Sequence, residues 1–315
     1  MDGHESRVAD APESVSASAS APTYPADADD AVTLPASVLR RYRRFSLYNS
    51  PYPAHDHGCA IDLYPASNEG LSPVAGEVLE TRTVRAPPKP YAHDEEYLIL
   101  VDAGDCVARI LHVEPAVEAG DSVAVGDSLG PMVRSGFFAP WVGNHVHVGF
   151  RRHDQNLRRA TGSLPVVADA SVEPLAWDGT GTVVETAATY ALLDSPDHPA
   201  PGEAFAGIAA DDGRVLDGGF GHYAAGGALT AGAAEATDST AVSLLGHPIG
   251  TARGRDVAWR DVDVLANGER ITGLSLFAAL DPEFGAKLVC PGHDFAVGDE
   301  VRVTIRDSDD PIRLG

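Results

Sequence analysis

Lysine is nearly absent from this chain, and cysteine is scarce. The 315 residues contain two lysines, Lys89 and Lys287, and three cysteines. The cysteines are odd in number and follow no zinc-finger spacing, so they indicate neither a disulfide framework nor a cysteine-rich metal site. We expect each of them to be a small buried thiol.

Long apolar stretches and several familiar motifs are also missing. No run of about 18 apolar residues occurs, and the N-terminus lacks a charged region followed by an apolar stretch. The Arg40-Arg41 pair is followed by a polar segment rather than an apolar one. We therefore expect no membrane span and no signal peptide, and a cytoplasmic location. No GxxxxGK, strand-associated GxGxxG or GxSxG motif points to nucleotide binding or a serine hydrolase.

Negative charge is abundant. The chain has 46 acidic and 23 basic residues, which give a formal net charge of −23. Such a surface repels phosphate backbones and anionic lipids, so neither nucleic acid nor a membrane is expected as a partner. A local basic patch could override this field, and the candidate is Arg40, Arg41, Arg43 and Arg44. High acidity with few lysines and much Ala and Gly is typical of halophilic proteins.

The length of the chain and the changes in composition along it predict two domains after an N-terminal tail. Residues 1–33 are mostly Ala, Ser, Asp and Pro, with too little apolar surface to offset the cost of ordering, so we expect a disordered acidic tail. From residue 34 onward, short apolar runs alternate with Gly, Pro and Asp. We place one β domain at residues 34–164 and a second β-rich domain of unknown role at 165–315.

Both domains are expected to be built from short strands. The expected strands lie within residues 72–79, 96–101, 106–113 and 145–150, and within 180–193, 261–276 and 300–306. Between apolar flanks, Asn267-Gly268 is a strong signal for a tight hairpin. The fold class is therefore mostly β.

Histidine is the commonest zinc ligand, and three regions of the chain offer candidates. In a strand, His145 and His147 point to the same face because side chains alternate. Upstream, His57 is followed by Asp62, whose carboxylate lies in an apolar context and requires compensation. His112 stands alone on an otherwise apolar strand. Each signal is weak by itself, since a polar strand face, a turn carboxylate or a core histidine would look the same.

The order of these pieces resembles the M23 zinc metallopeptidases, of lysostaphin and LytM type, over about residues 57–151. That family shows HxxxD, a Pro-Val-x-Ala strand turn, an apolar strand, Tyr-x-His-Leu, a Val-x-x-Gly repeat and a final Gly-x-His-Leu-His-Phe-Glu. The corresponding segments here are residues 57–62, 72–78, 97–101, 111–113, 117–130 and 143–148. So many landmarks in the right order are hard to obtain by chance.

The resemblance implies a fold, a cofactor and residue roles. The first domain would be an antiparallel β-sheet groove that binds Zn²⁺ through His57, Asp62 and His147. His112 and His145 would then be the catalytic pair that activates water and steadies the developing oxyanion. The implied reaction is hydrolysis of an amide bond in a peptide or protein substrate.

The spacing at the start of the motif leaves the first ligand open. His57 and Asp62 are separated by four residues, where the family has three. A β-bulge at Gly58 would let both side chains converge. Alternatively His55 or Cys59 is the first ligand, because both share the strand parity of His57.

Two other functions remain open beside the zinc-dependent amide hydrolase. One is a noncatalytic binding module that keeps the fold, with or without metal. The other rests on the Gly-Asp turns at residues 120–130, which are similar to those of biotinyl and lipoyl carrier domains. Such carriers present a lysine at a hairpin tip, and no lysine lies between Lys89 and Lys287. This excludes a carrier role but leaves open a metal-free hammerhead domain that is used for binding.

The charge generates a first testable prediction. Raising NaCl from about 0.1 M to about 1 M shortens the Debye length from roughly 10 Å to roughly 3 Å and screens self-repulsion. We expect the melting temperature to rise by at least about 3 °C, which corresponds to on the order of 1 kcal/mol. Thermal unfolding followed by circular dichroism measures it. A melting temperature independent of salt would indicate an ordinary acidic protein instead.

Overall fold

The structure is a computed structural model that describes residues 31–229 and 239–314. The expected disordered tail, residues 1–33, therefore lies almost wholly outside the described residues. Its last two positions belong to strand β1 (Val32–Pro35), which pairs in parallel with β11 (Val166–Asp169). The folded part thus begins slightly before the expected boundary at residue 34.

The chain is mostly β, as the sequence predicted. Within the described residues, the helical elements are the short helix α1 (Ala36–Leu39) and the 3-10 helix η2 (Pro53–Gly58). No helix of this part of the chain combines the length and apolar character needed to cross a bilayer. Two small sheets accompany two large ones: β1 with β11, and β4 (Glu69–Leu71) with β9 (Ser128–Pro131).

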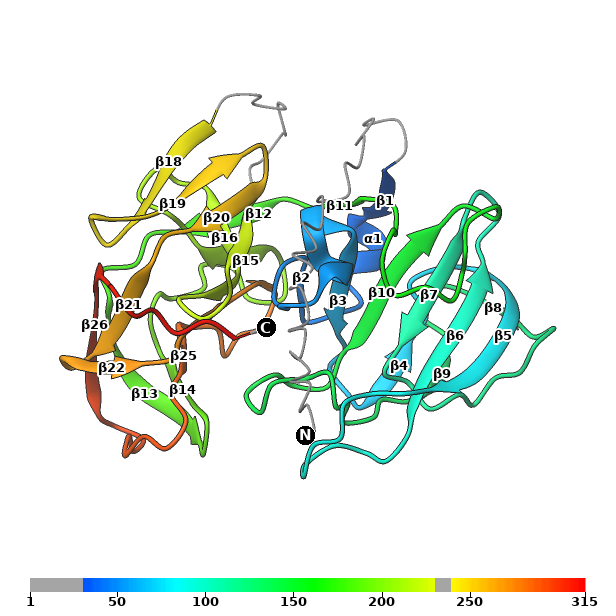
Figure 1. Cartoon of the computed structure of the whole chain (residues 1–315), viewed down its shortest axis with the longest axis horizontal. Helices are drawn as coiled ribbons and strands as arrows, with labels where there is room; N and C mark the ends of the chain where they lie inside the picture. Colours follow the sequence, from blue (N-terminus) through cyan, green and yellow to red (C-terminus); the bar gives the residue numbers. More distant parts are fainter. Residues whose placement is uncertain (1–30, 230–238, 315) are drawn as a thin grey trace, which may run out of the picture.

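Most of the first large sheet curls on one side of the molecule (Figure 1). Its central strands are antiparallel neighbours, and some of the paired segments lie far apart in the chain. In sheet order its strands are β12 (Val172–Leu175), β15 (Phe205–Ile208), β24 (Ala278–Ala279), β2 (Arg44–Ser46), β3 (Ala60–Tyr64), β10 (Val146–Arg151), β7 (Val107–Leu111), β6 (Glu96–Asp102), β5 (Gly76–Val84) and β8 (Ser122–Val123).

The second large sheet lies on the other side of the molecule (Figure 1). It is assembled from strands that all follow residue 179. In order they are β18 (Ser239–Leu244), β19 (His247–Arg253), β20 (Asp256–Trp259), β17 (Ala225–Leu229), β16 (Val215–Phe220), β23 (Gly273–Leu276), β25 (Lys287–Val289), β14 (Tyr190–Leu193), β13 (Thr180–Ala187), β26 (Glu300–Asp307), β21 (Val262–Ala266) and β22 (Glu269–Ile271).

The predicted Asn-Gly hairpin is confirmed. Ala266 and Glu269 are directly paired on β21 and β22, which leaves Asn267 and Gly268 as the two-residue turn. Both turn residues have positive φ, at 51° and 86°. This is the left-handed geometry that tight hairpins require and that Asn and Gly adopt most readily.

The two halves of the chain share the first sheet, which the sequence did not predict. β12, β15 and β24 all follow residue 165, yet they extend this sheet beyond β2. Phe205 and Ala278 are fully buried in the same hydrophobic core as Ile61 and Val148 of the first half. The second half therefore completes the core of the first.

The arginines of the candidate basic patch do not all gather in one place. Arg40 donates to the backbone carbonyl of Glu203, and Arg43 pairs with Asp281 at 3.7 Å. Arg44 turns inward and lies over an aromatic ring. Adjacency in the sequence is thus not adjacency on the surface.

A buried carboxylate joins the two halves. Asp217, on β16, is fully buried and accepts hydrogen bonds from the Ser46 hydroxyl at 2.5 Å and the Leu47 amide at 2.7 Å. Burial raises the pKa of Asp217 to about 6, although these two hydrogen bonds favour the charged form. Above that pH, the fold therefore contains an incompletely compensated buried charge.

The dependence of stability on the protonation of Asp217 predicts the effect of Asp217→Asn. A carboxyl pKa raised from 3.8 to about 6 gives stability that is present below about pH 4 and lost as the pH rises through 6. In the Asp217→Asn variant the amide oxygen accepts from the Leu47 N–H, and the amide NH2 group donates to the Ser46 hydroxyl oxygen, with no charge. We therefore expect its free energy of unfolding at pH 7 to be up to about 3 kcal/mol higher than that of the wild type. Chemical denaturation between pH 4 and pH 7 measures the difference.

Asp105→Asn is the matched control, because Asp105 is exposed and the same charge is removed. It should leave the pH dependence of the wild type unchanged. Parallel curves for the wild type and Asp217→Asn would contradict the prediction. Asp217→Ala, which leaves two donors without an acceptor, should instead lose about 1–3 kcal/mol.

Candidate metal centre

Asp62 and His147 face each other on neighbouring strands. The register of β3 and β10 pairs them directly, and paired residues project to the same face of a sheet. The Nδ1 atom of His147 lies 3.0 Å from the Oδ1 atom of Asp62. The sequence expectation that these two residues converge therefore agrees with the geometry of the sheet.

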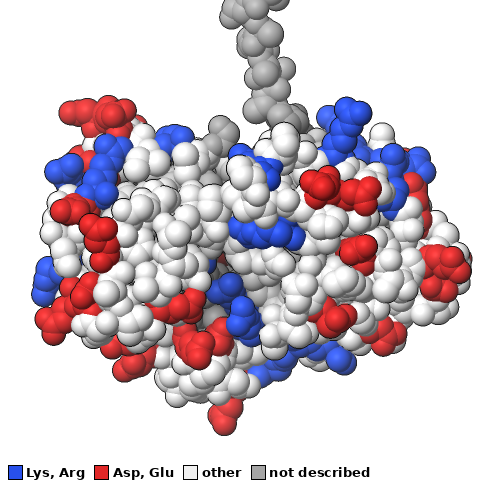
Figure 2. Space-filling view, turned by 90° about the horizontal axis from the view of Figure 1, so that it is seen from below, with Lys and Arg blue, Asp and Glu red and all other residues white. Residues whose placement is uncertain are grey.

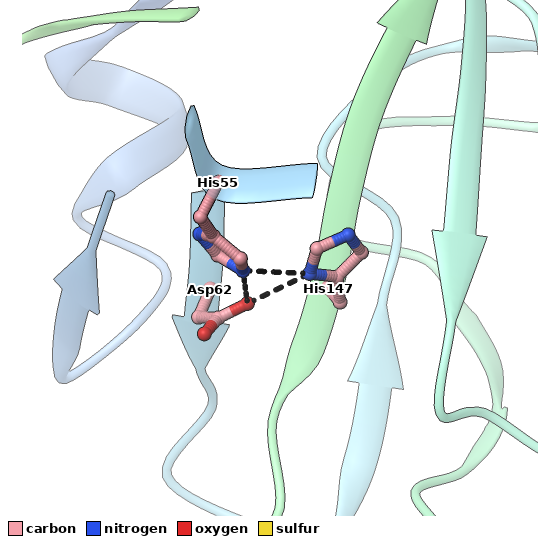
Figure 3. A group of neighbouring side chains, drawn as sticks. All are labelled: His55, Asp62 and His147. Carbon is pink, nitrogen blue, oxygen red and sulfur yellow. Dashed lines mark hydrogen bonds and ion pairs between the residues drawn. The ribbon is translucent and has the colours of Figure 1, made fainter. Parts of the chain in front are cut away.

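The third side chain of the group is His55. Its Nε2 atom lies 3.1 Å from Nδ1 of His147 and 3.3 Å from Oδ1 of Asp62. Figure 3 shows the three side chains pointing toward one another, with His55 reaching in from the turn before β3. His55 was one of the two alternatives for the first ligand position.

His57 does not join the group, which corrects its expected role as a zinc ligand. Its side chain is 60% exposed, and its Nδ1 atom lies 2.7 Å from Oδ2 of Asp256. The segment is a 3-10 turn rather than a strand, and φ is positive at both His57 (57°) and Gly58 (64°). Alternation of faces along a strand therefore does not apply here, and no β-bulge is needed.

Cys59, the other alternative, ends the turn and lies outside the group. Burial raises the pKa of its thiol to about 11. A raised pKa disfavours the thiolate, which is the form that binds metals. The thiol therefore has the character of a small buried hydrophobe.

Residues of the second half fix the turn that carries His55. The Arg255 guanidinium donates to the carbonyls of His57 (2.9 Å) and Gly58 (3.2 Å). A Cβ atom at position 58 would come within 2.6 Å of that guanidinium, and φ there is positive, so a larger residue would displace the guanidinium and strain the backbone. On the other side, Nδ1 of His55 contacts the Leu47 carbonyl at 2.8 Å. The ring is thus held at both ends.

The three ligand atoms have the spacing that a tetrahedral zinc site requires. The triangle of His55 Nε2, Asp62 Oδ1 and His147 Nδ1 has edges of 3.0, 3.1 and 3.3 Å. Bonds of 2.0–2.1 Å at tetrahedral angles place two ligands about 3.3 Å apart. Two imidazoles and one carboxylate are also a common catalytic zinc set, which leaves a fourth position for water. These residues fit the metal that the sequence suggested.

The buried carboxylate determines the electrostatics of the group. Asp62 is 2% exposed, and burial alone would raise its pKa, yet the neighbouring His145 and His55 hold that pKa well below its ordinary value. Burial lowers the pKa of His147 to about 3, so its ring is neutral at pH 7. For His55, the charge of Asp62 outweighs burial and raises the pKa. Asp62 therefore remains an anion that requires a nearby cation.

His112 and His145 also reach this site, as the sequence predicted. Nε2 of His145 lies 3.3 Å from Oδ1 of Asp62, and its Nδ1 lies 3.0 Å from the Gly143 carbonyl. The His112 ring centroid is 5.3 Å from that of His145 and 5.7 Å from that of His147. Four of the five residues named from the sequence are thus gathered in one place.

Glu96 is a residue of the site that the sequence did not indicate. It is 1% exposed, and its carboxylate contacts Nδ1 of His112 and accepts the His112 backbone N–H, both at 3.0 Å. The Ser135 hydroxyl donates to the same carboxylate. With its proton on Nδ1, His112 has Nε2 free toward the pocket. Its positive φ of 73° is a strained conformation that these contacts hold in place.

A cavity of about 170 Å³ opens onto these side chains. Aromatic residues form much of its wall, including Tyr52, Phe137 and Phe138, and Tyr223 is contributed by the second half of the chain. Arg109 adds a buried guanidinium, whose Nε donates to the Leu157 carbonyl at 2.6 Å. The site is therefore a small, mostly aromatic pocket with a cluster of titratable groups on its floor.

Comparison with known proteins gives a family but no activity. The model described as the N-terminal domain of DUF8155, a domain of unknown function, matches residues 33–168, and the model of its C-terminal domain matches residues 173–306. No curated protein and no solved structure matches the chain. The first match contains every residue of the metal cluster, and the second contains Asp217 and Arg255. With both domains present in order, the chain belongs to the DUF8155 family.

Proposed function

We propose that this chain is a zinc-dependent hydrolase of peptide or other amide bonds, with His55, Asp62 and His147 as the metal ligands. The observation that carries the proposal is the triangle of three ligand atoms 3.0–3.3 Å apart on the floor of a pocket. Two further histidines beside it give the site groups that can transfer protons. The resemblance to the M23 metallopeptidases supports the same chemistry.

The protein residues have separate roles in this proposal. A bound zinc ion would supply a Lewis acid that polarises the amide carbonyl and lowers the pKa of the attacking water. Glu96 keeps the proton of His112 on Nδ1, so that Nε2 can accept a proton from water as general base. Glu96 is therefore a positioning residue.

His145 is suited to stabilise negative charge. Both of its nitrogens face acceptors, the Gly143 carbonyl and the Asp62 carboxylate, so a ring with protons on both donates to each. An imidazole N–H held in this way beside the pocket would favour the oxyanion that develops as the carbonyl is attacked. Its orientation is fixed before the reaction, which avoids a cost of reorganisation.

The pocket limits the size of the group that can approach these residues. At about 170 Å³ it is smaller than the roughly 300–1,000 Å³ of most ligand pockets. This supports a small amide, or the end of a peptide, rather than the middle of a folded chain. The aromatic wall would contact an apolar substituent next to the amide.

The same small volume also favours a second candidate function. A noncatalytic module could bind zinc as a structural or sensory ion and exclude substrate by its size. One zinc ion per chain with no turnover of any peptide or small amide would favour this module over the hydrolase.

The first prediction of the proposal concerns metal binding. We expect about one zinc ion per chain, and an affinity reduced by on the order of 100-fold or more in His55→Ala, Asp62→Ala and His147→Ala. Zinc affinity can be measured by competition with a chromophoric chelator.

His57→Ala is the matched control, because it removes the same side chain two residues away in the same turn. Zinc affinity should stay within about threefold of the wild type, since His57 points to Asp256. Loss of zinc in His57→Ala but not in His55→Ala would show that the ligand assignment is wrong.

The second prediction separates catalysis from metal binding. In His112→Ala and His145→Ala, kcat/KM for a responsive peptide or amide should fall by about 100-fold to 10,000-fold while zinc is retained. Hydrolysis is followed by mass spectrometry of a short-peptide library that includes free and blocked ends. Full activity in both variants would rule out their proposed roles, provided that unfolding curves match the wild type.

A further inference from the structure

A second cavity, of about 400 Å³, lies beside the metal pocket and is lined by both halves of the chain. Val142 lines both cavities, so the segment around it separates them. In a chain of net charge −23, the basic residues here are unexpected: Arg43, Arg44, Arg134 and Lys287 all line this cavity. Figure 2 shows blue basic atoms along the middle of one face, with red acidic atoms mostly to either side.

Lys287 is the most unusual of these residues. It is one of two lysines in the chain, yet it is only 8% exposed. Its Nζ atom donates to the Trp141 carbonyl at 2.6 Å and lies 4.3 Å from the centre of the Tyr190 ring. Within the described residues, no carboxylate forms an ion pair with it. Burial and the nearby Arg44 lower its pKa to about 7, and the charge of Glu185 offsets this only in part.

Arg44 likewise has no carboxylate partner among the described residues. Its guanidinium lies 4.5 Å from the centre of the Tyr64 ring and 4.9 Å from that of Phe277. Its Nε atom is buried with no hydrogen-bond acceptor, and so is Nε1 of Trp141, another residue of the cavity wall. Buried donors without acceptors are costly, and a ligand that brings acceptor atoms would satisfy them.

Arg134 adds a third cation that is not matched by a carboxylate. Its guanidinium donates to the carbonyls of Ala139, Pro140 and Val142. These neutral acceptors hold the side chain in place but leave its charge unbalanced. The inner part of the cavity thus combines three cations with an excess of hydrogen-bond donors.

The charges around the whole cavity indicate how much negative charge fits. When Lys287 is protonated, the four basic residues are opposed by three acidic ones, Glu185, Asp281 and Glu283, which leaves one positive charge. Asp281 is already paired with Arg43, and Glu185 accepts a hydrogen bond from the Tyr190 hydroxyl. A singly charged anion would balance the remainder. A doubly charged phosphate would leave an excess negative charge in an already acidic molecule.

We propose that this cavity binds a carboxylate group, held by Lys287, Arg44 and Arg134. The carboxylate has the single charge that the wall leaves unbalanced, and its two oxygens accept several hydrogen bonds from ammonium and guanidinium donors. The volume suffices for an amino-acid-sized ligand. The site uses none of the proposed metal ligands, so this proposal does not depend on the proposed hydrolase activity.

Paired probes that differ in one charge test the proposal on the full chain. N-acetylglycine and acetyl-triglycine carry a carboxylate, and their C-terminal amides are neutral counterparts of nearly the same shape. At constant ionic strength and pH, we expect saturable binding of the acids, measured by tryptophan fluorescence and by stabilisation against denaturant. The amides should bind at least 10-fold more weakly. Tighter binding of acetyl-triglycine would identify a peptide C-terminus, and equal binding a small free carboxylate.

Two lysine variants locate the site. Lys287→Gln keeps a donor for the Trp141 carbonyl but removes the charge, and we expect the affinity for N-acetylglycine to fall by roughly 10-fold or more. Lys89→Gln makes the same change at the only other lysine, which is exposed, and should leave the affinity unchanged. If Lys287→Gln does not fold, Arg44→Gln has the same expected effect.

Three results would overturn the proposal. The first is the absence of saturable binding by either acid. The second is equal binding of acid and amide, which needs no variant to observe. The third is tighter binding of inorganic phosphate than of N-acetylglycine, which would replace the carboxylate with a multiply charged anion. Zinc-free protein should give the same affinities, so failure of the metal proposal is recognised separately.

Discussion

The buried carboxylate of Asp62 is the constraint on which the site depends. An ionised group at 2% exposure is costly unless cations or donors surround it. Here the compensating groups are imidazoles, with nitrogens of His55, His145 and His147 all within 3.3 Å of one carboxylate oxygen. Three rings can converge in this way only if each is oriented by its own backbone or side-chain contacts. A cation shared between them would relieve the same constraint more completely than a single proton.

The second half of the chain controls part of that orientation. Asp217 holds the Leu47 amide, the Leu47 carbonyl meets the His55 ring, and Arg255 fixes the turn on its other side. The contacts of Asp217 and Arg255 span 170 and 198 positions of sequence, so the geometry around Asp62 is a property of the whole chain. A cluster that resembles a single-domain site is here assembled by two domains.

The sequence indicated local features well and long-range ones poorly. Asp62 and His147 could be predicted because both lie in regular strands, where side-chain direction follows from alternation, and the Asn267-Gly268 hairpin depends on two adjacent residues. The resemblance to the M23 motif favoured His57 over His55, but the left-handed backbone at positions 57 and 58 makes this segment a turn, in which strand alternation does not apply. Glu96 gave no signal, since it opens an apolar strand and meets His112 only through the pairing of β6 and β7. The sharing of one sheet between both halves has no local signature at all.

Because the two halves share that sheet, neither domain is expected to be stable when encoded alone. β24 caps the edge of β2, and β15 supplies Phe205 to the core beneath it. A gene encoding residues 33–168 alone would yield an unprotected sheet edge and an unfilled core, both of which promote aggregation. Fusion or loss of either half as a unit is therefore disfavoured. The two domains are expected to occur together in the same chain, although each is recognised as a separate segment.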